Sequence, residues 1–369
     1  MDEHFEPFKM LSNFRDKTII ETSMFKNIFN SLLFFAVITA QAQTPTKGIR
    51  FVKTSLKNAF EIAQKQNKSV FVEIYAIGCP HCENFKKTFD NNAMVGAYYN
   101  QKFVSYQVEV NSPEGRALRQ KHNIYVVSTP MMTFWDKDEN LLHIQPTGDE
   151  QNNEPYLKTL ADRAIDPTKN SASYKGYFQQ GVQEDNFLIE YAYTCRMICD
   201  TVQNIAAMNA YAKKQEAVGF ANPSNFLILQ KVIIDDENPL FKYMMNNLPA
   251  FYAKNDPKLV NSTAENIVMY SLYCSRADGY SLEKIVEMKS NLKKVGIDDK
   301  SIAGRFLLIE TKTLFKAGQN DKAADVIDSF YKGVKSIDKK DAEFIEKYVR
   351  GFTQDDAVLK KLNWIFSKK

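Results

Sequence analysis

The sequence predicts an α/β domain followed by an all-α domain of helical hairpins. Strand and helix patterns alternate between about Ile49 and Ile165, apolar residues then recur at helical spacing, and no proline follows Pro257. Alternating strands and helices are typical of a sheet covered by helices, whereas helices alone pack against one another. We therefore expect an α/β domain at residues 43–168 and a helical domain at residues 169–369.

Residues 1–42 are expected to be a processing segment. From Met24 a short basic start leads into an apolar stretch, and Ala40-Gln41-Ala42 follows with the small residues of a signal-peptide cleavage site. We predict that translation starts at Met24, that residues 1–23 belong to an over-extended reading frame, and that the mature chain begins at Gln43. A buried or interfacial helix is the alternative. Export would place the protein in the periplasm or outside the cell, where disulfides persist.

Hydrophobic periodicity and turn residues predict the elements of the α/β domain. The expected helices are Leu56–Gln66, Pro80–Met94, Ser112–His122 and Tyr156–Ile165, and the expected strands are Ser69–Ala76, Phe103–Val110, Met131–Trp135 and Leu141–Gln145. The first strand is almost wholly apolar, as expected of a central strand buried on both faces. Pro80 falls in the first turn of its helix, where a missing N–H is tolerated.

The motif Cys79-Pro80-His81-Cys82 joins the first predicted strand to the next helix. Two cysteines with this spacing in a strand–helix context are typical of a redox pair. The sulfur of Cys79 would lie at the helix N-terminus, where unpaired N–H groups and the helix dipole favour a thiolate. A structural zinc site needs a second pair of ligands. Because His122 and His143 stand alone, we expect no metal.

Three further features make residues 49–166 resemble the thioredoxin superfamily. Glu73 lies six residues before Cys79, where that family places a buried acid beneath its active site. Ser128-Thr129-Pro130 falls where the family has a cis-proline beside the redox pair, and Gly148 matches a glycine at the end of the last strand. The resemblance implies a thioredoxin-like fold and thiol–disulfide exchange with protein thiols or disulfides.

The resemblance also implies a role for each site residue. Cys79 would attack and Cys82 would resolve the mixed disulfide, while Thr129 and Pro130 would line the groove that holds the partner. Glu73 would relay a proton when Cys82 attacks. No cofactor is expected beyond the redox-active disulfide itself, and the partners would be protein substrates and a redox partner protein.

The dipeptide Pro80-His81 resembles the Dsb-type oxidases rather than thioredoxin. Positive charge on His81 would favour the Cys79 thiolate and make the disulfide more oxidising. The sequence departs from the family at Gly78, where an aromatic residue is usual. It also lacks the helical insertion of Dsb-type oxidases between Cys82 and the proline. The direction of electron flow therefore stays open between oxidase and reductase.

The helical domain contains the other three cysteines. Cys195 and Cys199 are four residues apart on one expected helix, and Cys274 is in a similar apolar setting. We expect all three to be buried as small hydrophobic residues; a disulfide between Cys274 and one of the other two is the alternative. Hairpins such as Gly318–Tyr331 resemble tetratricopeptide-type units, although no period of about 34 residues is visible.

Composition excludes some classes of function. The formal net charge is +4 with basic residues spread along the chain, which gives no support for nucleic-acid binding. No apolar run in the expected mature chain is long enough to span a membrane. An alternative function is an interaction scaffold in which the helical array does the work and the thioredoxin-like domain is regulatory or vestigial. A sugar-processing helical barrel is least favoured, because about 200 residues are too few and no acid pair stands out.

Overall fold

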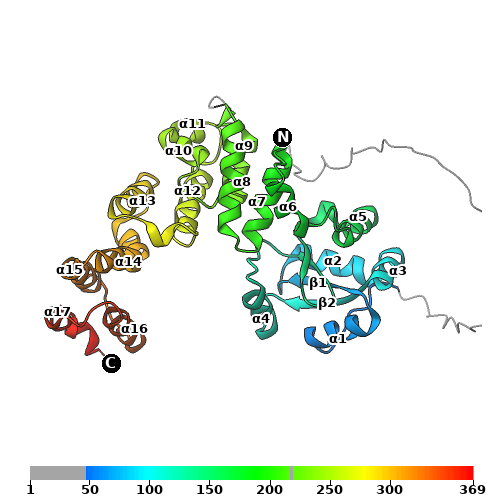
Figure 1. The fold of residues 1–369 in the computed structure, drawn as a ribbon, viewed down its shortest axis with the longest axis horizontal. Helices are drawn as coiled ribbons and strands as arrows, with labels where there is room; N and C mark the ends of the chain where they lie inside the picture. Colours follow the sequence, from blue (N-terminus) through cyan, green and yellow to red (C-terminus); the bar gives the residue numbers. More distant parts are fainter. Residues whose placement is uncertain (1–46, 217–218, 369) are drawn as a thin grey trace, which may run out of the picture. The chain divides into compact units, whose positions relative to one another are not determined.

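The computed structural model describes residues 47–216 and 219–368; the predicted signal peptide, including Met24 and the Ala40-Gln41-Ala42 motif, lies outside the described residues. The chain divides into two compact units (Figure 1). Among the described residues, the first unit contains residues 47–190 and Met197–Cys199; the second contains Tyr191–Arg196 and the described residues from Asp200 onward. The predicted limits at 43–168 and 169–369 divide the chain by type of structure and stay a prediction.

A mixed sheet of four strands forms the centre of the first unit in the described part of the chain. The strands are β1 (Ser69–Tyr75), β2 (Phe103–Glu109), β3 (Met131–Trp135) and β4 (Leu141–Pro146). Their spatial order is β2-β1-β3-β4, with β1 parallel to β2, and β3 antiparallel to both β1 and β4. The predicted α/β fold is confirmed, and each predicted strand agrees with the observed one to within one residue at either end.

Helices cover both faces of this sheet. The first unit contains α1 (Leu56–Gln66), α2 (Pro80–Asn91), α3 (Ala93–Lys102), α4 (Pro113–His122), α5 (Glu154–Ile165), α6 (Tyr174–Gln179) and most of α7 (Asp185–Met197). Phe71 and Phe134 pack with apolar residues of α2, α3 and α5. On the other face, Trp135 meets Phe60 of α1 edge-on. Because side chains alternate along a strand, Glu73 shares the face of Phe71 and points toward the α2 side.

The predicted helix Pro80–Met94 is interrupted in the structure. The helix α2 ends at Asn91, and Asn92 caps the next helix by accepting hydrogen bonds from the N–H groups of Met94 and Val95, both at 3.0 Å. Asparagine is a strong N-cap because its side-chain oxygen satisfies N–H groups that the helix leaves unpaired. The cap therefore outweighs the continuous helical pattern of the sequence.

The second unit is helical in its described part, as predicted. Its helices are α8 (Thr201–Lys214), α9 (Pro223–Lys231), α10 (Pro239–Asn246), α11 (Leu248–Tyr252), α12 (Pro257–Ser271), α13 (Leu282–Lys294), α14 (Asp299–Lys316), α15 (Asn320–Lys332), α16 (Lys339–Arg350) and α17 (Asp356–Phe366). Most pack on helices near them in the chain, as in stacked hairpins. None of the helices described is both long and apolar enough to cross a membrane. The tetratricopeptide-type repeat stays a prediction.

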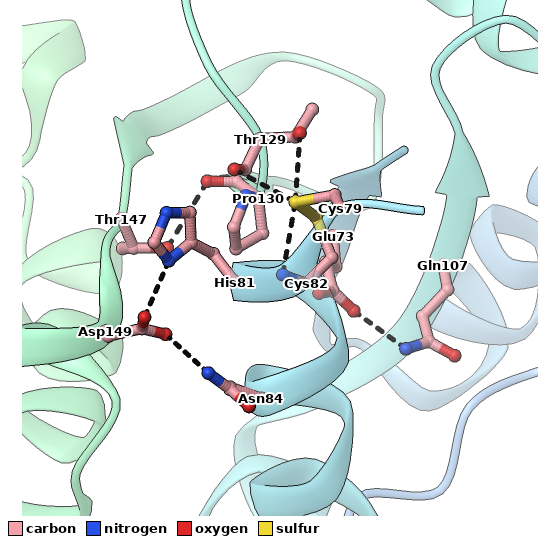
Figure 2. Close-up of a disulfide and its surroundings, with 10 residues drawn as sticks. All are labelled: Glu73, Cys79, His81, Cys82, Asn84, Gln107, Thr129, Pro130, Thr147 and Asp149. Carbon is pink, nitrogen blue, oxygen red and sulfur yellow. Dashed lines mark hydrogen bonds and ion pairs between the residues drawn. A yellow bond between two sulfur atoms is a disulfide. The ribbon is translucent and has the colours of Figure 1, made fainter. Parts of the chain in front are cut away.

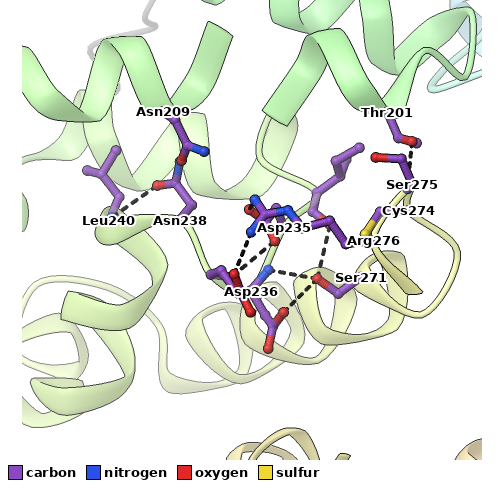
Figure 3. Close-up of polar contacts among 12 residues, drawn as sticks. Thr201, Asn209, Asp235, Asp236, Asn238, Leu240, Ser271, Cys274, Ser275 and Arg276 are labelled. Carbon is purple, nitrogen blue, oxygen red and sulfur yellow. Dashed lines mark hydrogen bonds and ion pairs between the residues drawn. The ribbon is translucent and has the colours of Figure 1, made fainter. Parts of the chain in front are cut away.

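A buried charged cluster holds part of the second unit together (Figure 3). Asp235 and Asp236 lie in the connection between α9 and α10 and are almost fully buried. Arg276 pairs with Asp235, and the Lys284 Nζ lies 2.8 Å from the Asp236 carboxylate. The Ser271 hydroxyl donates to Asp236 at 2.8 Å. Buried carboxylates need such partners, so the cluster ties this connection to α12 and α13.

The three cysteines outside the redox motif differ in their surroundings. Cys195 on α7 and Cys274 are buried, as predicted. The prediction is wrong for Cys199, which is exposed. The helix α7 ends at Met197, and Cys199 takes a left-handed backbone conformation with φ 54° before Asp200 caps α8. None of the three forms a disulfide within the described chain, which contradicts the alternative of a Cys274 pairing.

Candidate active site

The turn between β1 and α2 presents the first cysteine at a helix N-terminus. Gly78 has φ +75°, a left-handed conformation that glycine adopts at no steric cost. Cys79 is the N-cap of α2, and its sulfur accepts a hydrogen bond from the N–H of Cys82 at 3.2 Å. Pro80 occupies the first turn of the helix. This geometry places a backbone donor and the positive end of the helix dipole at the Cys79 sulfur, where both favour a thiolate.

Cys79 and Cys82 form a disulfide with a Cα–Cα distance of 5.3 Å. The two cysteines differ in access to solvent: Cys79 is half-buried, whereas Cys82 is only 4% exposed. A thiol that attacks another protein must be reachable, so this difference favours Cys79 over Cys82 as the attacking sulfur.

The loop before β3 lies against the Cys79 sulfur (Figure 2). The Thr129 hydroxyl donates to this sulfur at 3.4 Å, and the Thr129 carbonyl oxygen lies 3.4 Å from the same atom. The Thr129–Pro130 peptide bond is cis. Thr147 secures the loop from the far end of β4, because its N–H and its hydroxyl contact the Pro130 carbonyl oxygen at 3.0 and 3.3 Å.

Glu73 is a buried acid on the face of the sheet that α2 covers. Its side chain is 1% exposed, and the Gln107 side-chain N–H of β2 donates to it at 2.7 Å. Burial raises the pKa of Glu73 to about 7, and the Gln107 hydrogen bond opposes this increase only in part. Charged residues of α2 change the pKa of Glu73 by smaller amounts. The carboxyl therefore lies under the redox helix and changes protonation near neutral pH.

His81 pairs with an acidic residue from the segment after β4. Its Nδ1 lies 2.7 Å from an oxygen of Asp149, and the Asn84 side-chain N–H donates to the other oxygen at 3.1 Å. Asn84 and His81 together lower the pKa of Asp149, in that order of size. The expected positive charge of His81 therefore has a carboxylate against it (Figure 2).

Sequence reasoning missed Gln107, Asn84, Thr147 and Asp149 as site residues. Asp149 follows Gly148, which was singled out only as a glycine at the end of the last strand. An acidic residue at that point was a usable signal, but it required knowing that β4 ends beside α2. Gln107 could have been found from the parallel register, since it is the β2 residue directly opposite Glu73.

No cluster of potential metal ligands occurs in residues 47–216 or 219–368. His143, considered as a ligand above, is fully buried; it accepts a hydrogen bond from the Ser171 N–H and contacts Gln145. Burial lowers the pKa of His143 to about 3, so the ring is neutral. His122 packs against Trp135, and burial lowers its pKa as well. Both rings belong to the packing of the domain rather than to a pair of ligands.

Comparison with known proteins identifies the class of this domain. Residues 52–137 match the family model described as "Thioredoxin-like". Together with the sheet order and the redox turn, this match shows that the chain carries a domain of the thioredoxin superfamily.

Individual relatives resemble only this part of the chain. A "Thiol:disulfide interchange protein DsbD" from Haemophilus influenzae (strain PittEE) is 28% identical over 108 residues, which are 28% of this chain and 18% of that protein. A solved thioredoxin from Thermus thermophilus is 20% identical, with a TM-score of 0.29, and matches 37% of this chain and 99% of its own. A structure described as "DsbH Oxidoreductase" is 15% identical, with a TM-score of 0.27, and matches 34% of this chain and 92% of its own.

Proposed function

We propose that the protein is an exported thiol–disulfide oxidoreductase that acts on protein thiols or disulfides through Cys79 and Cys82. The observation that carries the proposal is the disulfide at the N-terminus of α2, with the partly accessible Cys79 sulfur against the Thr129–Pro130 loop. The similarity to a thiol:disulfide interchange protein over 108 residues supports the same chemistry. The disulfide itself is the redox group, and no other cofactor is required.

In the reductive direction, the Cys79 thiolate attacks one sulfur of a partner disulfide. A mixed disulfide forms, and the other partner sulfur leaves as a thiolate that takes up a proton. Cys82 then loses its proton and attacks the Cys79 sulfur, which releases the second partner thiolate. Two electrons pass to the partner and the Cys79–Cys82 disulfide forms; the oxidative direction reverses each step. The helix N-terminus and the Thr129 hydroxyl stabilise the Cys79 thiolate in both directions.

Glu73 is the proton acceptor for Cys82 in this proposal. Attack by Cys82 requires its thiolate, and a buried thiol ionises poorly without a base. A carboxyl with a pKa of about 7 holds a proton or accepts one near neutral pH, as a general base should. Gln107 orients the carboxylate by donating to one of its oxygens.

The surface around Cys79 fits a polypeptide partner. Ile77, two residues before the cysteine, is 84% exposed, and a Cβ added at Gly78 would meet no atom within 4 Å. An exposed apolar side chain beside open backbone allows another chain to approach the sulfur closely. We assign Thr129 and Pro130 to the other side of this approach. The partners would be proteins with exposed thiols or disulfides, together with a redox partner protein that regenerates the pair.

Trapping experiments test both the activity and the order of attack. Cys82→Ser removes the resolving thiol, so mixed disulfides through Cys79 should accumulate and appear on non-reducing gels. Cys79→Ser should trap few or none, since Cys82 is buried. The wild-type protein should turn over in insulin-reduction or dithiothreitol-oxidation assays.

Equal trapping by the two variants would contradict the assignment of Cys79 as the attacking sulfur. Absence of turnover in the folded wild-type protein would favour the alternative of a helical interaction scaffold. Cys199→Ser provides a control, because this cysteine is exposed but lies outside the redox turn. It should leave turnover and trapping unchanged.

A further inference from the structure

The segment Thr147–Asp149 connects the two structures that flank the Cys79 sulfur. Thr147 binds the carbonyl oxygen of Pro130 at one end. At the other end Asp149 contacts two side chains of the first turns of α2, His81 at 2.7 Å and Asn84 at 3.1 Å. Both carboxylate oxygens are therefore used, and both partners come from the redox helix.

We propose that Asp149 is a positioning residue for the redox pair: it fixes the ring of His81 and offsets the charge that His81 presents to Cys79. This inference rests on the proposed thiol–disulfide exchange at the same pair. With Nδ1–H donated to the carboxylate, the ring is held on the side of the segment 147–149 (Figure 2). His81 and Asp149 then act as one pair whose net charge is close to zero when the ring is protonated.

The pair determines how strongly the site favours the reduced state. Positive charge near Cys79 stabilises its thiolate, which exists only in the reduced protein, and so makes the disulfide more oxidising. A carboxylate against the ring opposes that stabilisation. The Cys79–Cys82 disulfide is therefore less oxidising than the Pro-His dipeptide alone implies. Removing the carboxylate should make the disulfide more oxidising.

Asp149→Asn tests the proposal, because it removes the charge and keeps one side-chain oxygen, which can accept the hydrogen bond of His81. The wild-type protein and the variant are measured in the same buffers, so that the Asp149 carboxylate is the main difference between them. The first readout is the acid dissociation constant of Cys79, from thiolate absorbance of the reduced full-length protein. The second is the equilibrium constant for reduction of the disulfide by two glutathione molecules to give the dithiol and one glutathione disulfide.

We expect the Cys79 acid dissociation constant to increase about threefold in Asp149→Asn. The equilibrium constant for reduction by glutathione should also increase, by up to the same factor. A threefold increase corresponds to about 15 mV, because a tenfold change corresponds to about 30 mV. Glu150→Gln is the matched control: it removes one carboxylate from the next residue, which is exposed and makes no described side-chain contact with α2. It should change either constant by less than about 1.5-fold.

Unchanged constants in Asp149→Asn would overturn the proposal, as would an equal shift in Glu150→Gln, which would indicate a general effect of net charge. The thiolate titration requires no turnover. It therefore decides the role of Asp149 even if the wild-type protein fails the insulin and dithiothreitol assays, a failure that would instead overturn the proposed function.

Discussion

Replacing Glu73 with glutamine should stabilise the first unit in a pH-dependent way. The side chain is 1% exposed and its ionised form loses almost all hydration, with one hydrogen bond from Gln107 in return. Glutamine has nearly the same shape, and its side-chain oxygen can accept the same hydrogen bond. The substitution therefore removes the ability to ionise with little change in packing.

The expected magnitude follows from the pKa of the buried acid. Burial raises the pKa of Glu73 from 4.5 to about 7, and each pKa unit corresponds to about 1.4 kcal/mol. Because the folded state holds the proton more tightly, the wild-type protein loses stability as the pH rises from 4.5 to about 7, by about 3 kcal/mol in total. Glutamine does not ionise, so the variant does not lose stability in this way. The difference in unfolding free energy between variant and wild type should be near zero at pH 4.5 and about 3 kcal/mol at pH 8.

Urea unfolding of the oxidised protein, followed by tryptophan fluorescence, measures this difference. The chain contains two tryptophans, and Trp135 lies fully buried in the sheet that carries Glu73. A Trp364→Phe background leaves Trp135 as the reporter of the first unit. Glu83→Gln provides a control, because that acid is exposed on α2 and its replacement should change stability by less than about 0.5 kcal/mol at either pH.

A difference between Glu73→Gln and wild type that is the same at pH 4.5 and pH 8 would refute the reasoning. It would mean that the carboxyl ionises in the folded protein as it does in the unfolded chain. Glu73 would then be unsuited to accept a proton from Cys82 near neutral pH, and the mechanism proposed above would need another base.

Three further outcomes are expected. Cys274→Ser should destabilise the second unit by on the order of 1–3 kcal/mol, because it places a hydroxyl at a buried site, whereas Cys199→Ser at an exposed site should cost less than about 0.5 kcal/mol in chemical denaturation. Arg276→Met should cost about 2–3 kcal/mol in the same assay, somewhat less than the loss of a fully buried partner, since Arg276 is 33% exposed while Asp235 is 3% exposed. N-terminal sequencing of the native protein should begin at Gln43, and finding residues 1–23 on it would contradict the predicted cleavage.

Most of the α/β fold could be predicted because its sequence signals are local. The strands β1 to β4 are short apolar runs between turn residues, and α1 has a clear amphipathic period, so pattern and structure coincide. Errors arose where one residue overrides the pattern. Asn92 ends one helix and caps the next, and the left-handed Cys199 lies between α7 and α8, so that Cys195 and Cys199 do not share the one helix expected for them. Hydrophobic periodicity does not predict the backbone conformation of a single residue.

The residues of the candidate site also differ in whether local sequence signals could predict them. Cys79 and Cys82 were predicted from their spacing within one strand–turn–helix segment, and Glu73, which lies in the same segment, was added by the resemblance to a family. Thr129 and Pro130 followed only from the resemblance to a family, since nothing local links them to a turn 50 residues earlier.

Asp149 shows what spacing and resemblance both leave out. It lies 68 residues from His81 in the chain, yet its carboxylate is 2.7 Å from the imidazole, because β4 ends on the same side of the sheet as the start of α2. A dipeptide between two cysteines therefore does not by itself define the charge at the sulfur. Asp149, three residues after the end of β4, contributes a charge of opposite sign, and redox poise in this domain should depend on the sum of the two.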